Sequence, residues 1–127
     1  MLKLSSKGFT FAEVIVTVFV LATAIVSALL FFTNALLLTQ YSKDITEATS
    51  HGEYLFEEMR SRGALDNIVQ TNWQNWYASV GLRTLPEEGI AVTFNDAAAD
   101  PLEIYAVVSW RRRARVLEES FATRMTK

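Results

Sequence analysis

The chain has 127 residues, enough for one small domain, and a formal net charge of -2 at pH 7. This charge excludes a protein built mainly around nucleic-acid phosphates, which would need an excess of lysine and arginine. The chain has no cysteine, which excludes disulfide bonds and thiolate zinc sites. Half of the residues are hydrophobic and the longest apolar run lies near the N-terminus, so the sequence predicts an apolar segment followed by an ordinary soluble domain.

The N-terminal segment has the layout of a membrane anchor. Two lysines, Lys3 and Lys7, precede Gly8, and Val14–Leu38 follows as 25 residues without a charge. As a helix this run would be roughly 37 Å long, enough to cross a hydrocarbon core of about 30 Å. The lysines would keep the N-terminus in the cytoplasm. Glu13 stands at the mouth of the run, where burial of a carboxylate is costly unless a partner pairs with it.

The residues around Gly8 form a specific motif. They read Lys7-Gly8-Phe9-Thr10-Phe11-Ala12-Glu13, and this order resembles the processing site of type IV prepilins and type II secretion pseudopilins. The resemblance implies that residues 1–8 are a leader peptide, which prepilin peptidase removes by cleaving after Gly8. It implies methylation of the new N-terminal amine on Phe9, and makes Glu13 the family's fifth-position glutamate, which acts with Phe9 in subunit assembly.

Two commoner kinds of segment compete with this interpretation. A secretory signal peptide would have its cleavage site at Ala22-Thr23-Ala24, but Glu13 would then lie inside the apolar core, and hydrophobicity continues to Leu38. A plain single-pass anchor fits the apolar run equally well. The Gly8-Phe9 junction and Glu13 favour the pilin-like interpretation.

The predicted helix continues beyond the apolar run. Its full extent is about Phe9 to Arg62, or roughly 80 Å, with Gly63 as a stop. Apolar or small residues recur at helical spacing along one face, while the charged residues, Asp44 among them, fall mostly off that face. The stripe is Tyr41, Ile45, Ala48, Gly52, Leu55 and Met59.

The rest of the chain predicts a small sheet. A short helix capped by Asp66 and ending at Gly81 carries Trp73 and Trp76 toward the core. Three strand-like runs follow, at 90–94, 104–110 and, more weakly, 116–123. The expected fold class is α+β, with a long N-terminal helix whose first half is transmembrane and an antiparallel sheet of about three strands on its second half. Residues 9–38 form the transmembrane and assembly helix, and 39–127 the globular domain.

The second half resembles a subgroup of the same family. The region Trp73–Trp76, the pair Leu85-Pro86, the strand end Val107–Trp110 and the helix end Glu57–Arg60 look like V-type minor pilins and the I-type minor pseudopilin. Major pilins commonly have a proline where this chain has Leu30, and this difference favours a minor subunit or a pseudopilin over a major pilin.

Other constellations carry no catalytic chemistry. His51, the only histidine, is predicted to be a solvated residue on the helix surface. No nucleophile motif or phosphate-binding loop occurs, so neither enzyme activity, nor a cofactor, nor a metal is expected.

Four arginines cluster at a predicted hairpin tip. The favoured interpretation is that they are solvated and protect the sheet edge from pairing with other chains. Contact of this cluster with DNA or with an acidic partner stays open. Its members are Arg111, Arg112, Arg113 and Arg115.

The functional expectation is a structural minor subunit of a type IV pilus or type II secretion pseudopilus, in the filament or at its tip. The resemblance implies three partners, which are prepilin peptidase, other pilin or pseudopilin subunits, and an inner-membrane assembly platform. It places the chain in a bacterial inner membrane, with a cytoplasmic N-terminus and an extracytoplasmic domain, before assembly. The alternatives are a DNA-uptake pilin that uses the arginine cluster and a plain membrane-anchored domain.

Overall fold

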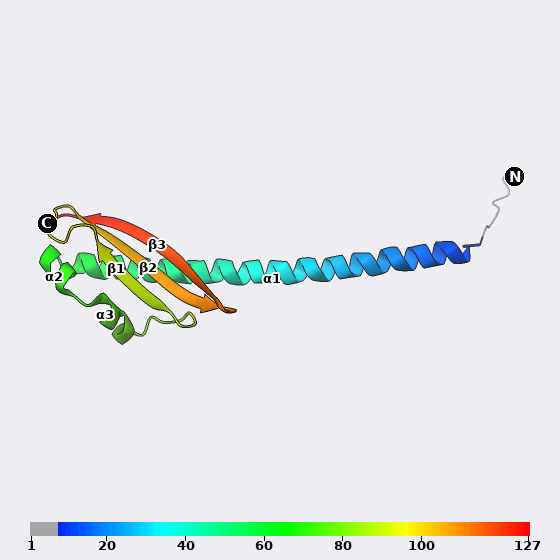
Figure 1. Ribbon diagram of the computed structural model, residues 1–127, viewed down its shortest axis with the longest axis horizontal. Helices are drawn as coiled ribbons and strands as arrows, with labels where there is room; N and C mark the ends of the chain where they lie inside the picture. The colour runs from blue at the N-terminus through cyan, green and yellow to red at the C-terminus, as the bar shows by residue number, and fades with distance from the viewer. Residues whose placement is uncertain (1–7) are drawn as a thin grey trace. The chain divides into compact units, whose positions relative to one another are not determined.

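The computed structural model describes residues 8–127, so all of the expected leader except Gly8 lies outside the described residues. The elements are α1 (Phe11–Ser61), α2 (Leu65–Gln70), α3 (Trp73–Val80), β1 (Gly89–Phe94), β2 (Leu102–Arg112) and β3 (Arg115–Met125) (Figure 1). A long apolar N-terminal helix with a small antiparallel sheet confirms the predicted α+β class. The chain divides into two compact units, Met1–Gln40 and Tyr41–Lys127, and α1 contributes to both.

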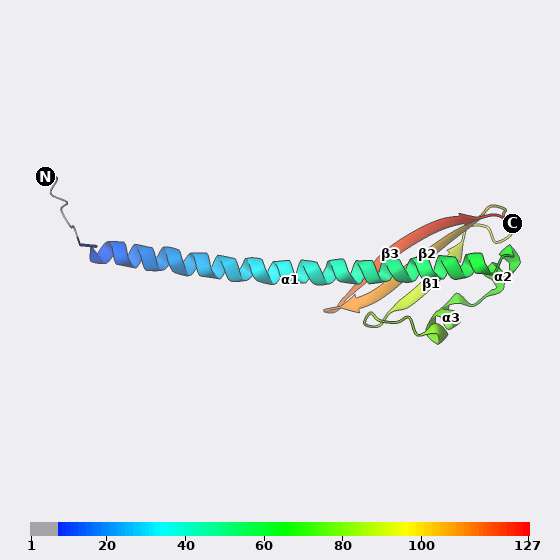
Figure 2. The same cartoon turned by 180° about the vertical axis from the view of Figure 1, so that it is seen from behind.

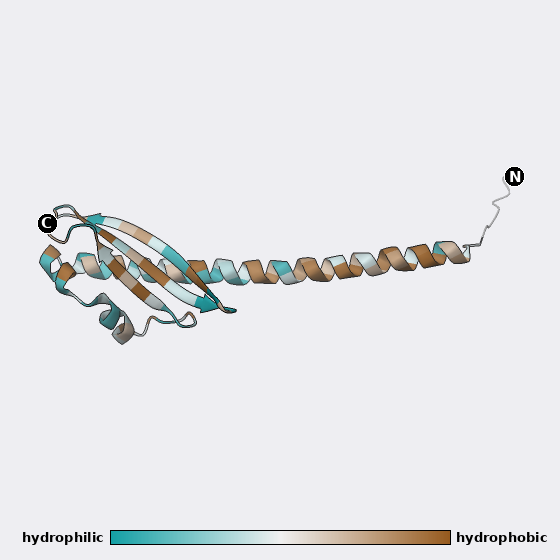
Figure 3. Cartoon of the chain, in the orientation of Figure 1, coloured by the Kyte–Doolittle hydropathy of each residue, from teal (hydrophilic) through white to brown (hydrophobic). Residues whose placement is uncertain are grey.

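The part of α1 in the first unit is apolar on all sides. Its large hydrophobic side chains are exposed, Phe19 by 72% and Phe31 by 71%. The colouring by hydropathy in Figure 3 shows that hydrophobic residues predominate along this part of the helix. The most apolar 18-residue window of α1 has a mean hydropathy of 2.8 and none of it is buried. By length and composition, α1 can therefore cross a membrane.

The hydroxyl side chains within the apolar run are satisfied by the helix itself. Four hydroxyls donate to the backbone carbonyl four residues earlier, at distances of 2.7–2.9 Å, as Thr17 does to Glu13 and Ser27 to Thr23. The run therefore presents few unpaired polar groups to an apolar environment.

In the second unit, α1 buries one face. Ala48, Leu55 and Met59 of the predicted stripe have no exposed surface. Tyr41 was expected on the same face but is 46% exposed, because it lies at the very start of this unit. Asp44 was expected off the stripe but is buried, and an arginine from the sheet compensates its charge.

The predicted short helix is two helices. The N-cap of α2 is Ala64, so the expected cap Asp66 lies inside its first turn. Asn72 breaks the helical run and caps α3, accepting a hydrogen bond from the amide of Asn75 at 3.0 Å. Trp73 is buried and donates its indole N–H to the carbonyl of Ile68, as its predicted core position requires.

The sheet has the order β1-β2-β3, with both pairings antiparallel. Along β2 the buried residues alternate with more exposed ones, as predicted. The inward set is Leu102, Ile104, Ala106, Val108 and Trp110. These residues belong to one apolar core with the buried residues of α1, α2 and α3, and Figure 2 shows the sheet against α1 from the other side.

Candidate functional site

The expected cleavage junction lies in an open, non-helical stretch. Gly8, Phe9 and Thr10 precede α1, all three are exposed, and the Phe9 side chain is 85% exposed. A Cβ built on Gly8 meets no atom of residues 8–127 within 4 Å. Packing against these residues therefore does not require glycine at this position.

Glu13 has a local partner that the sequence analysis missed. Its Oε2 accepts hydrogen bonds from the backbone N–H of Thr10 at 2.8 Å and from the Thr10 hydroxyl at 3.0 Å. The amide of Glu13 in turn donates to Thr10 Oγ1 at 3.3 Å. This is a reciprocal capping box, and its signature, a threonine with a glutamate three residues later, was readable in the sequence.

The arginine cluster lies at the β2–β3 hairpin tip, as predicted, but its members differ in environment. Arg112 makes a bidentate ion pair with Asp44 of α1, from Nε to Oδ2 at 2.9 Å and from Nη2 to Oδ1 at 2.7 Å. The hydrogen bond to Asp44 raises the pKa of Arg112. The expectation of a wholly solvated tip is therefore wrong for Arg112, which ties the hairpin to α1.

The other three arginines of the tip are exposed. Arg111 pairs with exposed Glu87 at 3.3 Å, and its backbone amide donates to the carbonyl of Pro86. Arg113 and Arg115 form no ion pair with any of the residues 8–127. Three cationic side chains at one turn are thus available to solvent or to a partner.

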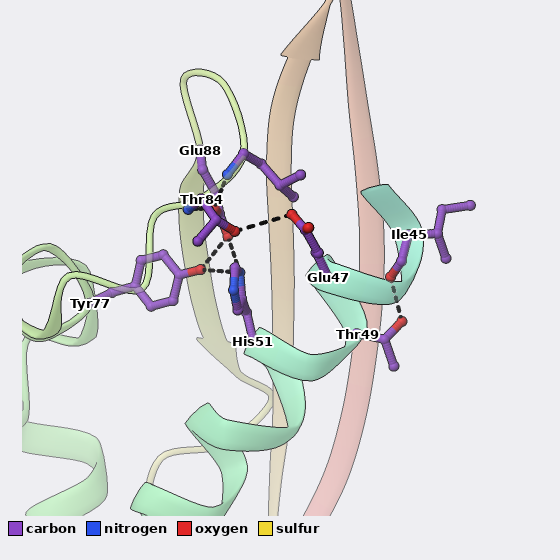
Figure 4. Close-up of polar contacts among 8 residues, drawn as sticks. Ile45, Glu47, Thr49, His51, Tyr77, Thr84 and Glu88 are labelled. Atoms are coloured by element: carbon purple, nitrogen blue, oxygen red, sulfur yellow. Dashed lines mark hydrogen bonds and ion pairs between the residues drawn. The ribbon is translucent and has the colours of Figure 1, made fainter. Parts of the chain in front are cut away.

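A buried polar cluster joins α1, α3 and the loop before β1. His51 Nδ1 lies 2.5 Å from Glu88 Oε1 and 3.1 Å from the Tyr77 hydroxyl, and that hydroxyl also donates to Glu88 Oε1 (Figure 4). Glu88 Oε2 accepts from the backbone amides of Thr84 and Leu85, both at 3.0 Å. The predicted solvated His51 is wrong, because its ring is buried by partners that lie far along the chain.

This cluster is built as a structural joint. Burial, together with the hydrogen bond to Glu88, raises the pKa of Tyr77, so its hydroxyl stays protonated and donates. The Glu88 side chain has no exposed surface, and that of His51 is 10% exposed, so a substrate has little access. Among residues 8–127, no group of three or more His, Asp or Glu side chains is placed to hold a metal ion.

Comparison of the chain with known protein families, with curated proteins and with solved structures finds no match.

Proposed function

We propose that the chain is a structural minor subunit of a type IV pilus or a type II secretion pseudopilus. In this proposal prepilin peptidase cleaves after Gly8 and methylates the amine of Phe9. Residues 9–38 hold the subunit in the inner membrane, and an assembly platform then moves it into a filament, where the same residues pack against neighbouring subunits.

The observation that carries the proposal is the junction at Gly8. Its sequence resembles the prepilin processing site, and packing in the described fold gives no other reason for a glycine there. The junction is exposed and is followed at once by an apolar helix whose side chains the chain itself leaves uncovered. Lipid before assembly and neighbouring helices after it would cover that surface.

Glu13 would have two roles in such a subunit. In the free chain its carboxylate caps α1 through Thr10. In the filament it would meet the Phe9 amine of an adjacent subunit, in a region with little water. A slipped register would leave both charges unpaired at low dielectric, so the pair would set the axial position of each subunit.

Processing of the full-length chain in a host that makes prepilin peptidase tests the proposal. The intact mass of the product should correspond to a chain that begins at Phe9 with one added methyl group. Gly8→Val should leave the full-length precursor in the membrane. Glu13→Gln is the matched control, since it leaves the junction intact and should still be cleaved. A wild-type N-terminus at Ile25 would contradict the proposal in favour of a secretory signal, and an uncleaved chain would favour a plain anchor.

A further inference from the structure

The β2–β3 hairpin tip carries a local excess of positive charge. Four arginines lie there, and two of them pair with a carboxylate, Arg112 with Asp44 and Arg111 with Glu87. Glu47 also acts on the charge of Arg112, but it is itself paired with Lys43. The Arg111–Glu87 pair is open to solvent, with 54% and 67% of its side chains exposed, and such pairs hold weakly. The next carboxylates along β3, Glu118 and Glu119, lie three or more residues past Arg115.

The turn places an arginine where the backbone disfavours it. Arg113 and Ala114 form the two-residue connection between β2 and β3, with φ angles of 50° and 62°. Two-residue hairpin turns with both φ angles positive strongly favour asparagine and glycine. Arginine and alanine therefore make this turn at a conformational cost, and the arginine brings no ion pair within residues 8–127 that would offset it.

The ion pair of Arg112 with Asp44 fixes this tip to α1 just after the uncharged run of the helix ends. No charged residue occurs from Val14 to Ser42, and Asp44 is the second charge after that run. Asp44 is six residues from Leu38, a reach of at most about 20 Å even for a fully extended chain. If residues 9–38 cross a membrane, the tip is therefore tethered close to the lipid headgroups.

Apolar and aromatic residues near the tip suit the same environment. Val116 follows Arg115 and is 57% exposed, and Tyr41 is 46% exposed at the start of the second unit. Tyrosine is enriched at membrane interfaces, and basic residues with adjacent apolar side chains are typical of surfaces that bind anionic lipid.

From these observations we propose that the tip binds the phosphate groups of anionic phospholipids through Arg111, Arg113 and Arg115. The contact holds the second unit at the membrane surface before assembly and must break when the subunit leaves the membrane. It rests on the proposed membrane insertion of residues 9–38. Each basic residue near an anionic surface favours binding by roughly fivefold, and the effect weakens as salt screens the charges.

The absence of cysteine allows a single spin label to report on the tip. The full-length chain carries the label at Ala114→Cys and is inserted into nanodiscs of phosphatidylcholine alone or mixed with phosphatidylglycerol. A label at Ala122→Cys, exposed on β3 away from the turn, is the control. We expect the label at position 114 to be immobilised and shielded from a water-soluble relaxing agent only in the anionic discs. The control label should not change, and high salt should reverse the effect.

Variants separate charge from structure. Replacing Arg111, Arg113 and Arg115 together with glutamine should abolish the immobilisation of the label in anionic discs, which is the ordering of the tip. Arg112 keeps its pair with Asp44 in this variant. Arg113→Asn alone should weaken the ordering roughly fivefold and preserve the hairpin, because asparagine tolerates this conformation better.

The outcomes also separate this inference from the proposed function. Insertion into discs without ordering of the tip overturns only the lipid contact, whereas failure to insert overturns both. Immobilisation of the label in neutral discs by added duplex DNA would contradict the lipid proposal and assign the tip to nucleic acid. Immobilisation only when each disc holds a second copy of the chain would contradict it in favour of a neighbouring subunit.

Discussion

Glu88 is the residue around which the buried polar cluster is organised. Its carboxylate contacts the His51 ring nitrogen and accepts hydrogen bonds from the Tyr77 hydroxyl and from two backbone amides. A buried carboxylate is costly unless it is satisfied in this way. The cluster therefore joins α1 and α3 to the loop before β1 at a single point.

The raised pKa of Tyr77 makes this joint sensitive to alkali. Because the folded pKa lies above the unfolded value of about 10, the stability contributed by the neutral hydroxyl is complete below about pH 10 and is lost as the pH rises above it. In a fragment of residues 36–127, which contains the whole second unit, the free energy of unfolding should fall above that pH by up to about 1.4 kcal/mol per pH unit from this group. Urea denaturation at several alkaline pH values measures the slope.

Tyr77→Phe is the matched variant for this measurement. It should be less stable than wild type at neutral pH by about 1–3 kcal/mol, because Glu88 loses a donor, and its alkaline slope should be shallower. Equal slopes in the two proteins would show that Tyr77 ionises as readily folded as unfolded.

Sequence reasoning at the residue scale succeeds only for local signals. The alternation of buried and more exposed residues along β2 is such a signal, and the structure confirms it. Asp44 and His51, by contrast, are buried by partners 68 and 37 residues away, and no local pattern specifies those partners. The capping box of Glu13 is a local signal too, since Thr10 and Glu13 stand three residues apart just before the apolar run.

At the scale of elements, α1 and β3 come unusually close at Gly52. A Cβ on Gly52 would lie 2.8 Å from ring carbons of Phe121. The strands could be predicted because alternation of buried and exposed residues is a local signal, and 90–94, 104–110 and 116–123 all lie within β1, β2 and β3. The role of Gly52 could not be predicted from the sequence, because it depends on which ring the sheet brings against the helix.

The effect of Gly52→Ala on stability should depend on the Phe121 ring, being destabilising when the ring is present and stabilising when it is removed. Alanine in a helix interior gains about 1 kcal/mol over glycine, while forcing a methyl group into a packed site costs typically 1–3 kcal/mol. Because the cost exceeds the gain over most of this range, we expect Gly52→Ala to lower the free energy of unfolding of fragment 36–127 by up to about 2 kcal/mol. In a Phe121→Ala background the same change should raise it by up to about 1 kcal/mol. A stabilising effect in both backgrounds, measured by urea denaturation, would mean that the ring moves aside freely.

At the scale of the whole molecule, the chain combines a unit that buries its own core with a segment that buries nothing. Residues 41–127 enclose one apolar cluster, whereas the apolar side chains of α1 before Tyr41 are exposed. A surface of this kind requires lipid or other protein. In the proposed function the same segment is covered first by lipid and then, in the filament, by neighbouring subunits. The charge on Glu13 sets the register between those subunits.

Incorporation of the chain beside other subunits tests this account most directly. The full-length chain is expressed with the other subunits of a pilus or pseudopilus, and complexes are recovered by crosslinking and co-purification. Wild type should be incorporated. Glu13→Gln keeps a residue that completes the capping box but loses the charge, so it should insert and be cleaved but stay in the membrane. Thr10→Ala removes the capping hydroxyl and keeps the charge, so it should be incorporated.

The pair of variants separates the two roles of Glu13, because one removes only the charge and the other only the capping hydroxyl. The account predicts that incorporation follows the charge on Glu13. It is contradicted if wild type is processed yet absent from every crosslinked complex, or if Glu13→Gln is incorporated as well as wild type.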